Sequence, residues 1–80
     1  MDAEARAGAA KRLLDDPLMV EVLDSIEAQA ILVWRTTPLA DTASREIAWH
    51  SLKASERVRY ALQGIVDNGL IEARRAVQAR

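Results

Sequence analysis

The sequence predicts an all-α protein: an antiparallel hairpin of two long helices, with a short N-terminal helix and a C-terminal helical tail. Strong helix formers, above all alanine, leucine, glutamate and arginine, dominate the 80 residues. Only three glycines and two prolines are present, which leaves little room for strands joined by turns. Two long stretches also repeat apolar residues at helical spacing. We therefore expect one helical domain over residues 1–80.

The first helix is expected over residues 3–14, an alanine-rich stretch that ends in two leucines. Asp16 can cap the next helix by accepting hydrogen bonds from its free amides, and Pro17 suits the first helical position because it lacks an N–H. The pair of Asp15 and Asp16 could instead serve acid–base chemistry or hold a cation, but no third ligand or base is near it in the sequence.

The second helix is expected over residues 17–36. Its apolar residues recur at helical spacing, and they are Met19, Leu23, Ile26, Ala30 and Val33, with Val22 and Trp34 widening the stripe. A loop should follow at residues 36–41, because the residue before Pro38 avoids the helical region. Asp41 or Thr42 can then cap the third helix.

The third helix is expected over residues 42–68. Its main apolar stripe is predicted to comprise Ile47, Ala54, Val58, Ala61, Leu62 and Ile65, with Ala48, Leu52 and Val66 on one flank. Gly69 is expected to end this helix in the left-handed conformation, so that Leu70 folds back on Ile65. Residues 70–79 can form a further basic helix.

Size and charge both favour association. A chain of this length buries only about 60–65% of its unfolded surface, so its core is marginal. Residues 1–41 carry eight acidic side chains against four basic ones, whereas residues 42–80 carry seven basic side chains against four acidic ones. Halves of opposite sign favour antiparallel packing, within one chain or between chains. A homo-oligomer is the expected state.

Three aromatic residues are the candidate interface residues. Trp49 and Tyr60 lie eleven residues apart, and therefore on one side of the third helix, opposite the main stripe and among charged residues. They could anchor a contact between chains, or the first helix or the tail of the same chain could cover them. Trp34, on the edge of the second helix's stripe, is expected to behave as a core residue.

The sequence offers no enzyme chemistry, cofactor or metal site. Cysteine is absent and His50 is the only histidine, so we expect no zinc site and read His50 as a residue at the boundary of the apolar face. The serines Ser44, Ser51 and Ser55 have no base beside them, and no glycine-rich phosphate loop occurs. The apolar run at 30–34 is far too short to cross a membrane, and we expect no small-molecule substrate.

Nucleic-acid binding is the alternative hypothesis. It would use Arg57, Arg59, Arg74 and Arg75, and the apolar spacing from Glu46 to Ile71 is similar to that of a winged helix-turn-helix. However, residues 52–55 lack turn chemistry, and too few residues follow to form a wing. The overall acidity also argues against DNA as the partner, and solvated arginines on the outside of a helix are the simpler interpretation.

The order of these features resembles a family of short helical proteins encoded by tailed bacteriophages and prophages, over about residues 13–75. The most distinctive matching segments are Asp16-Pro17-Leu18, Trp34-Arg35-Thr36-Thr37-Pro38 and Arg45-Glu46 followed by Trp49. The resemblance implies a non-enzymatic role in the head-and-packaging module, in the virion or in the cytoplasm of the bacterial host. It implies other phage structural proteins as partners and supplies no catalytic residues. Under the alternative hypothesis of nucleic-acid binding, the protein would be a small DNA-binding regulator or a small-terminase-like packaging subunit.

Overall fold

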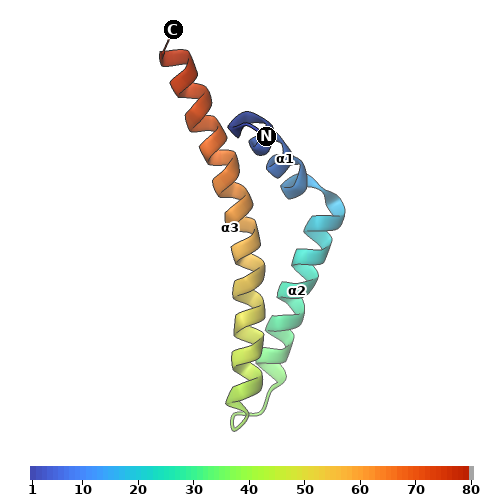
Figure 1. Ribbon diagram of the computed structural model, residues 1–80. Helices are drawn as coiled ribbons and strands as arrows, with labels where there is room; N and C mark the ends of the chain where they lie inside the picture. Colours follow the sequence, from blue (N-terminus) through green and yellow to red (C-terminus); the bar gives the residue numbers. More distant parts are fainter. Residues whose placement is uncertain (80) are drawn as a thin grey trace.

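The computed structural model describes residues 1–79 and confirms the predicted all-α class. Three helices, α1 (Ala3–Asp15), α2 (Pro17–Thr36) and α3 (Thr42–Gln78), account for almost all of this range, and no strand occurs in it (Figure 1). None of these three helices is both long and apolar enough to cross a bilayer.

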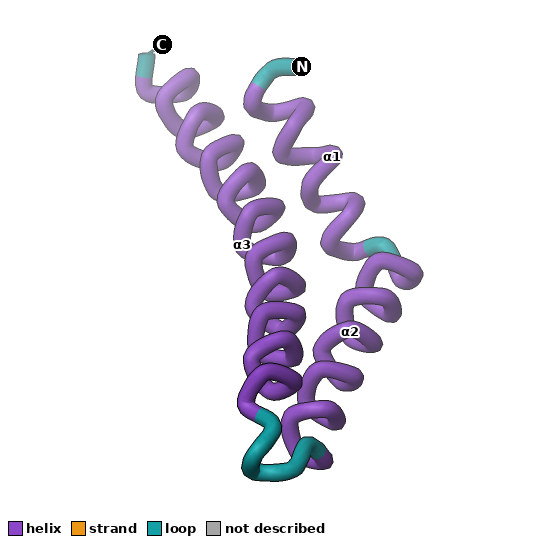
Figure 2. Tube along the Cα trace, turned by 60° about the horizontal axis from the view of Figure 1, so that its bottom comes forward, coloured by secondary structure: helices purple, strands orange, loops and turns teal. Residues whose placement is uncertain are grey.

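Helix α3 is the long axis along which the other two helices pack. Helix α2 lies along its first half and α1 along its second half, and α1 and α2 touch each other little (Figures 1 and 2). Near the loop, Trp34 of α2 contacts Trp49 of α3, whereas at the other end of α3 Gly69 lies against Ala7 of α1. A cross-section through the packed part of the molecule therefore cuts only two helices.

The short break at Asp16 separates α1 from α2 and starts the second helix. Asp16 has an extended backbone, and its carboxylate accepts a 2.9 Å hydrogen bond from the backbone N–H of Met19. Pro17 occupies the first helical position, where no backbone donor is required. Both residues therefore act as the sequence predicted.

The start of α3 is stabilised in the same way by Asp41, which the sequence left as an alternative to Thr42. The Asp41 carboxylate accepts from the backbone N–H of Ser44 at 3.1 Å and from its hydroxyl at 2.7 Å. These hydrogen bonds, with the hydroxyl bond as the larger cause, hold the pKa of Asp41 below its ordinary value. Arg45 closes the loop by donating to the carbonyl of Pro38 at 2.9 Å.

The predicted end of the third helix at Asn68 is wrong, because α3 continues without interruption to Gln78. No glycine within residues 1–79 has a positive φ angle, so Gly69 is not a left-handed cap, and Leu70 is largely exposed instead of folding back. Gly69 is needed for close packing: a Cβ at this position would overlap the Cβ of Ala7 and lie 3.1 Å from the carbonyl oxygen of Ala3.

The face of α3 that packs on α1 and α2 also differs from the predicted stripe. Its members, here called the packed seam, alternate at spacings of three and four residues and are all buried or half-buried: Ala48, Leu52, Ser55, Arg59, Leu62, Val66, Gly69 and Ala73. The predicted flank thus provides the contact, while most of the predicted main stripe, including Ile47 and Val58, is exposed. The small residues Ala48, Ser55 and Gly69 let the helices approach closely. They do not stand out in the sequence as a row of large apolar side chains would.

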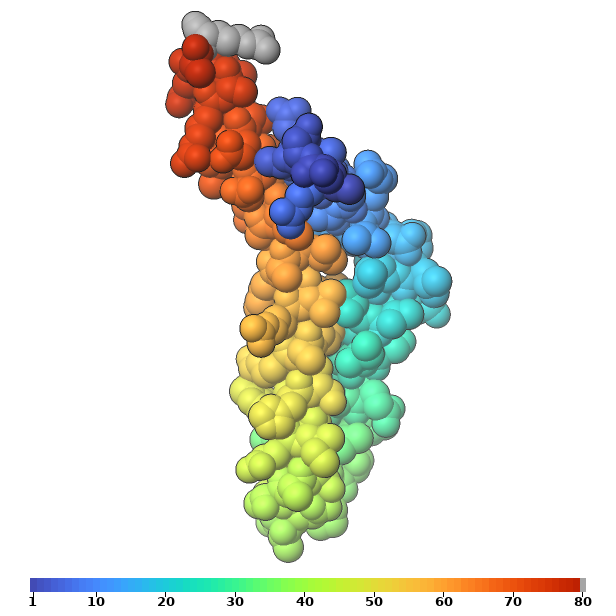
Figure 3. All heavy atoms as spheres, viewed as in Figure 1, coloured from blue at the N-terminus to red at the C-terminus, as the bar shows by residue number. Residues whose placement is uncertain are grey.

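The resulting molecule is long and thin (Figure 3). Its principal-axis extents are 62 × 22 × 17 Å, and its radius of gyration is 17.6 Å. A compact domain of this length would have a radius of gyration of about 12 Å. Because each helix is covered on one side only, no large side chain within residues 1–79 is less than 2% exposed.

Candidate protein-interaction site

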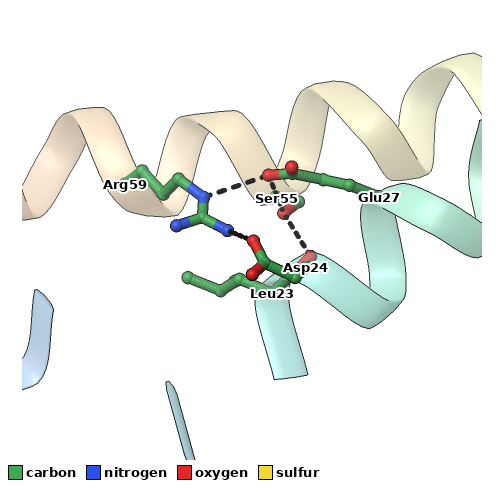
Figure 4. A network of polar contacts seen from close by, with 5 residues as sticks. All are labelled: Leu23, Asp24, Glu27, Ser55 and Arg59. Atoms are coloured by element: carbon green, nitrogen blue, oxygen red, sulfur yellow. Dashed lines mark hydrogen bonds and ion pairs between the residues drawn. The ribbon is translucent and has the colours of Figure 1, made fainter. Parts of the chain in front are cut away.

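A polar network joins α2 to the middle of α3 (Figure 4). Arg59 donates from Nε to Glu27 at 3.0 Å and from Nη2 to Asp24 at 2.7 Å. Ser55, which is only 3% exposed, donates to Glu27 Oε1 at 3.1 Å and approaches the carbonyl oxygen of Leu23 at 3.5 Å. The hydrogen bond to Glu27 is the largest cause of the raised pKa of Arg59. This network brings together the acidic α2 and the basic α3.

Nearer the loop, the two tryptophans form one side of the α2–α3 contact. Their ring centroids are 6.5 Å apart, and the rings are tilted by 47°. The Nζ of Lys53 lies 4.5 Å from the centre of the Trp49 ring, within cation–π range. A groove of about 320 Å³ runs beside the pair, with Ile31 and Leu52 among its lining residues. We call this surface the tryptophan groove.

The structure brings together two of the three predicted interface residues. Trp34 and Trp49 are in contact and are 49% and 47% exposed, so Trp34 is not the core residue that the sequence predicted. Tyr60 is 71% exposed and lies further along α3, outside the tryptophan groove. Neither α1 nor the tail covers Trp49 or Tyr60 as the intramolecular alternative required, since α1 packs on another side of α3.

The four arginines of the alternative hypothesis do not form one surface. Arg59 is engaged by two carboxylates of α2, and Arg75 pairs with Glu72 at 3.1 Å. Arg57 is exposed and lies two residues from Arg59, and therefore on another side of the helix. Residues 52–55, where a helix-turn-helix would need its turn, belong to the uninterrupted α3.

A second groove lies on the other side of the α2–α3 contact, and none of the three predicted interface residues lines it. Ile26, Val33 and Ile47 contribute to its lining, and its volume is about 470 Å³, larger than that of the tryptophan groove. Ile47 is 67% exposed there. The apolar stripe that begins at Ile47 is visible in the sequence. It is predicted there to face the second helix, whereas in the structure Ile47 lies at the surface.

Both grooves offer apolar contact area between helices and contain no nucleophile–base pair among their lining residues. Such surfaces bind by burying apolar side chains, and their polar rims provide orientation. Comparison of the chain with protein-family models, with curated proteins and with solved structures found no match.

Proposed function

We propose that this protein is a non-enzymatic helical oligomer that acts through protein–protein contacts. The observation that carries the proposal is its exposed surface. The chain has an accessible area of 6171 Å² and a mass of 8.8 kDa. A compact monomer of that mass exposes about 4,800 Å², so roughly 1,400 Å² is in excess. Much of the exposed surface is apolar, and association would remove it from water.

In this proposal α2 and the first half of α3 act as an antiparallel helical hairpin that contacts other chains on both sides. Contacts between the two helices run in opposite order along the chain, from Trp34 with Trp49 to Asp24 with Arg59, which supports this arrangement. The hairpin carries the tryptophan groove on one side and the groove beside Ile47 on the other.

We further propose that the contacts serve a phage particle or its assembly, in the virion or in the cytoplasm of the bacterial host. This part rests on the resemblance of residues 13–75 to short helical phage proteins. The partners would be further copies of the chain and other phage structural proteins. Genes for a portal, capsid or terminase next to the gene for this chain would support the role, whereas a cluster of repressor genes would favour the DNA-binding alternative.

Light scattering on the full-length protein at micromolar concentration tests the first part of the proposal. An associated, helical species is expected, and a stable monomer would contradict it. The DNA-binding alternative predicts a salt-dependent shift of duplex DNA that weakens when Arg57 and Arg59 are replaced. It has less support, because Arg59 is already paired with Asp24 and Glu27.

A further inference from the structure

Helix α3 carries a second row of residues beside the packed seam, displaced from it by one position. This row, here called the open seam, consists of Ile47, Ser51, Ala54 and Val58. The same spacing continues to Ala61 and Ile65, but these two residues line a pocket with the start of α1 and are not counted in the open seam. Its spacing alternates between four and three residues, as in helices that pack along another helix. Its first two residues, Ile47 and Ser51, line the groove beside Ile47, and Val58 is 43% exposed. The open seam therefore has the pattern of a packing surface without a helix of this chain to cover it.

Helix α2 extends this surface on its own side of the groove. Val22, Ile26, Gln29 and Val33 follow the same spacing, and Val22 and Ile26 are 47% and 41% exposed. Ile26 and Val33 line the groove together with Ile47 and Ser51, which makes the rows of α2 and α3 one continuous face.

Charged residues are excluded from this face. Helix α2 contains four charged residues, Glu21, Asp24, Glu27 and Arg35, and α3 contains seven between residues 45 and 67, yet none of the eleven falls on either row. The tryptophan groove differs, because Arg35 lines it and Lys53 lies over Trp49. Depletion of charge is typical of the core of a protein interface.

We propose that a second copy of this chain covers the open seam, so that two thin layers pair face to face as a helical bundle. This inference names the partner and the face of the self-association proposed above and rests on that proposal. In a two-fold pairing each residue near the axis meets its own copy, so a self-pairing face must avoid charge there. The uncharged face satisfies this condition, whereas the basic rim of the tryptophan groove would repel itself.

The area also fits a second copy. If both chains buried their excess of roughly 1,400 Å², the interface would total about 2,800 Å², which is within the range of obligate homodimers. Bundles of four helices are held together by rows spaced in this way. Pairing would cover α2 and α3 on the side that the monomer leaves open.

Sedimentation equilibrium of matched glutamate variants tests the face. The wild-type chain should be a dimer at micromolar concentration. Val58→Glu places two charges in the proposed interface and should raise the dissociation constant at least about 30-fold, as loss of an interface hot spot does. Tyr60→Glu, on the opposite side of the same helix, is the control and should leave the dimer unchanged.

A second measurement covers the case in which Val58→Glu does not fold. Because the chain has no cysteine, Ser51→Cys introduces a single thiol on the open seam, and Gln63→Cys introduces one away from it. The rate of thiol labelling of Ser51→Cys should fall at least about tenfold as the protein concentration rises through dimerisation, while that of Gln63→Cys stays constant.

The outcomes separate the two proposals. A wild-type dimer that Val58→Glu leaves intact, with the Ser51→Cys thiol equally reactive at all concentrations, would overturn the assignment of the face but leave self-association standing. Dissociation by Tyr60→Glu but not by Val58→Glu would also overturn the assignment of the face, and it would place the interface on the side of α3 that carries Tyr60. A wild-type chain that is monomeric throughout would overturn both proposals.

Discussion

Replacing Gly69 by alanine should separate α1 from α3, although the same change elsewhere in the helix should stabilise it. The new Cβ would overlap the Cβ of Ala7 and lie 3.1 Å from the carbonyl oxygen of Ala3. Ordinary carbon–carbon contacts lie at about 3.5–4.0 Å, so α1 must move outward by more than about 1 Å. Overpacking of this kind costs about 1–3 kcal/mol of folding free energy.

Gly64→Ala is the matched control, because it lies in the same helix and the added Cβ would have no atom within 4 Å apart from the adjacent backbone of its own helix. Alanine is better than glycine in a helix interior by about 1 kcal/mol, and this gain is common to both variants. The difference between them therefore isolates the contact with α1, and Gly69→Ala should be less stable than Gly64→Ala by about 1–3 kcal/mol.

Urea unfolding followed by far-ultraviolet circular dichroism, at one fixed protein concentration, measures this difference. A fixed concentration is needed because association adds to the apparent stability. Equal stabilisation by Gly69→Ala and Gly64→Ala would refute the close approach of α1 to α3, and with it the role assigned here to Gly69.

Three further changes probe other parts of the fold. Asp16→Ala should cost about 1 kcal/mol of unfolding free energy through loss of the cap on α2, whereas Asp15→Ala should stay within about 0.5 kcal/mol; equal effects in denaturant unfolding would contradict the cap. The lowered pKa of Asp41 means that its contribution to stability is complete above its ordinary pKa of 3.8 and is lost as the pH falls through the lower folded value. Acid unfolding of Asp41→Asn should lack that component, and profiles parallel to wild type would argue against it. Trp34→Ala should cost about 1–2 kcal/mol, less than a buried tryptophan, because half of the side chain is already exposed, whereas Tyr60→Ala should cost less than about 0.5 kcal/mol by thermal unfolding; a loss at Tyr60 as large as at Trp34 would contradict their different surroundings.

The elements that depend on local chemistry could be predicted from the sequence. Asp16 and Pro17 mark the start of α2 because a cap and a missing donor act over one helical turn. The all-α class followed from the abundance of strong helix formers and from the helical spacing of apolar residues. These features need no knowledge of what the helix packs against.

The features that depend on packing could not be predicted in the same way. Gly69 followed by Leu70 has the pattern of a helix cap, and only the approach of Ala7 explains why the glycine lies inside α3. The packed seam contains Ser55 and Arg59, which a count of apolar residues leaves out, although both join α3 to α2. The predicted apolar stripe of the third helix therefore lies one residue away from the packed seam for most of its length.

The three candidate interface residues lie at two separate places on the surface. The sequence singled out Trp34, Trp49 and Tyr60, because large aromatic residues are common interface anchors. The first two form one groove, but Tyr60 is separate from it. The second groove was hidden because its residues had been assigned to the interior, and only the position of α2 on α3 shows that Ile47 and Val58 remain exposed.

Sedimentation equilibrium of the full-length wild-type protein, with helicity measured on the same samples, tests the central claim most directly. The claim is that one chain forms an incomplete layer of helices that a second copy completes. We expect a helical species of twice the 8.8 kDa chain mass at micromolar concentration. A fully helical species of 8.8 kDa that persists across the whole concentration range would contradict the claim, because its exposed apolar face would then need no partner.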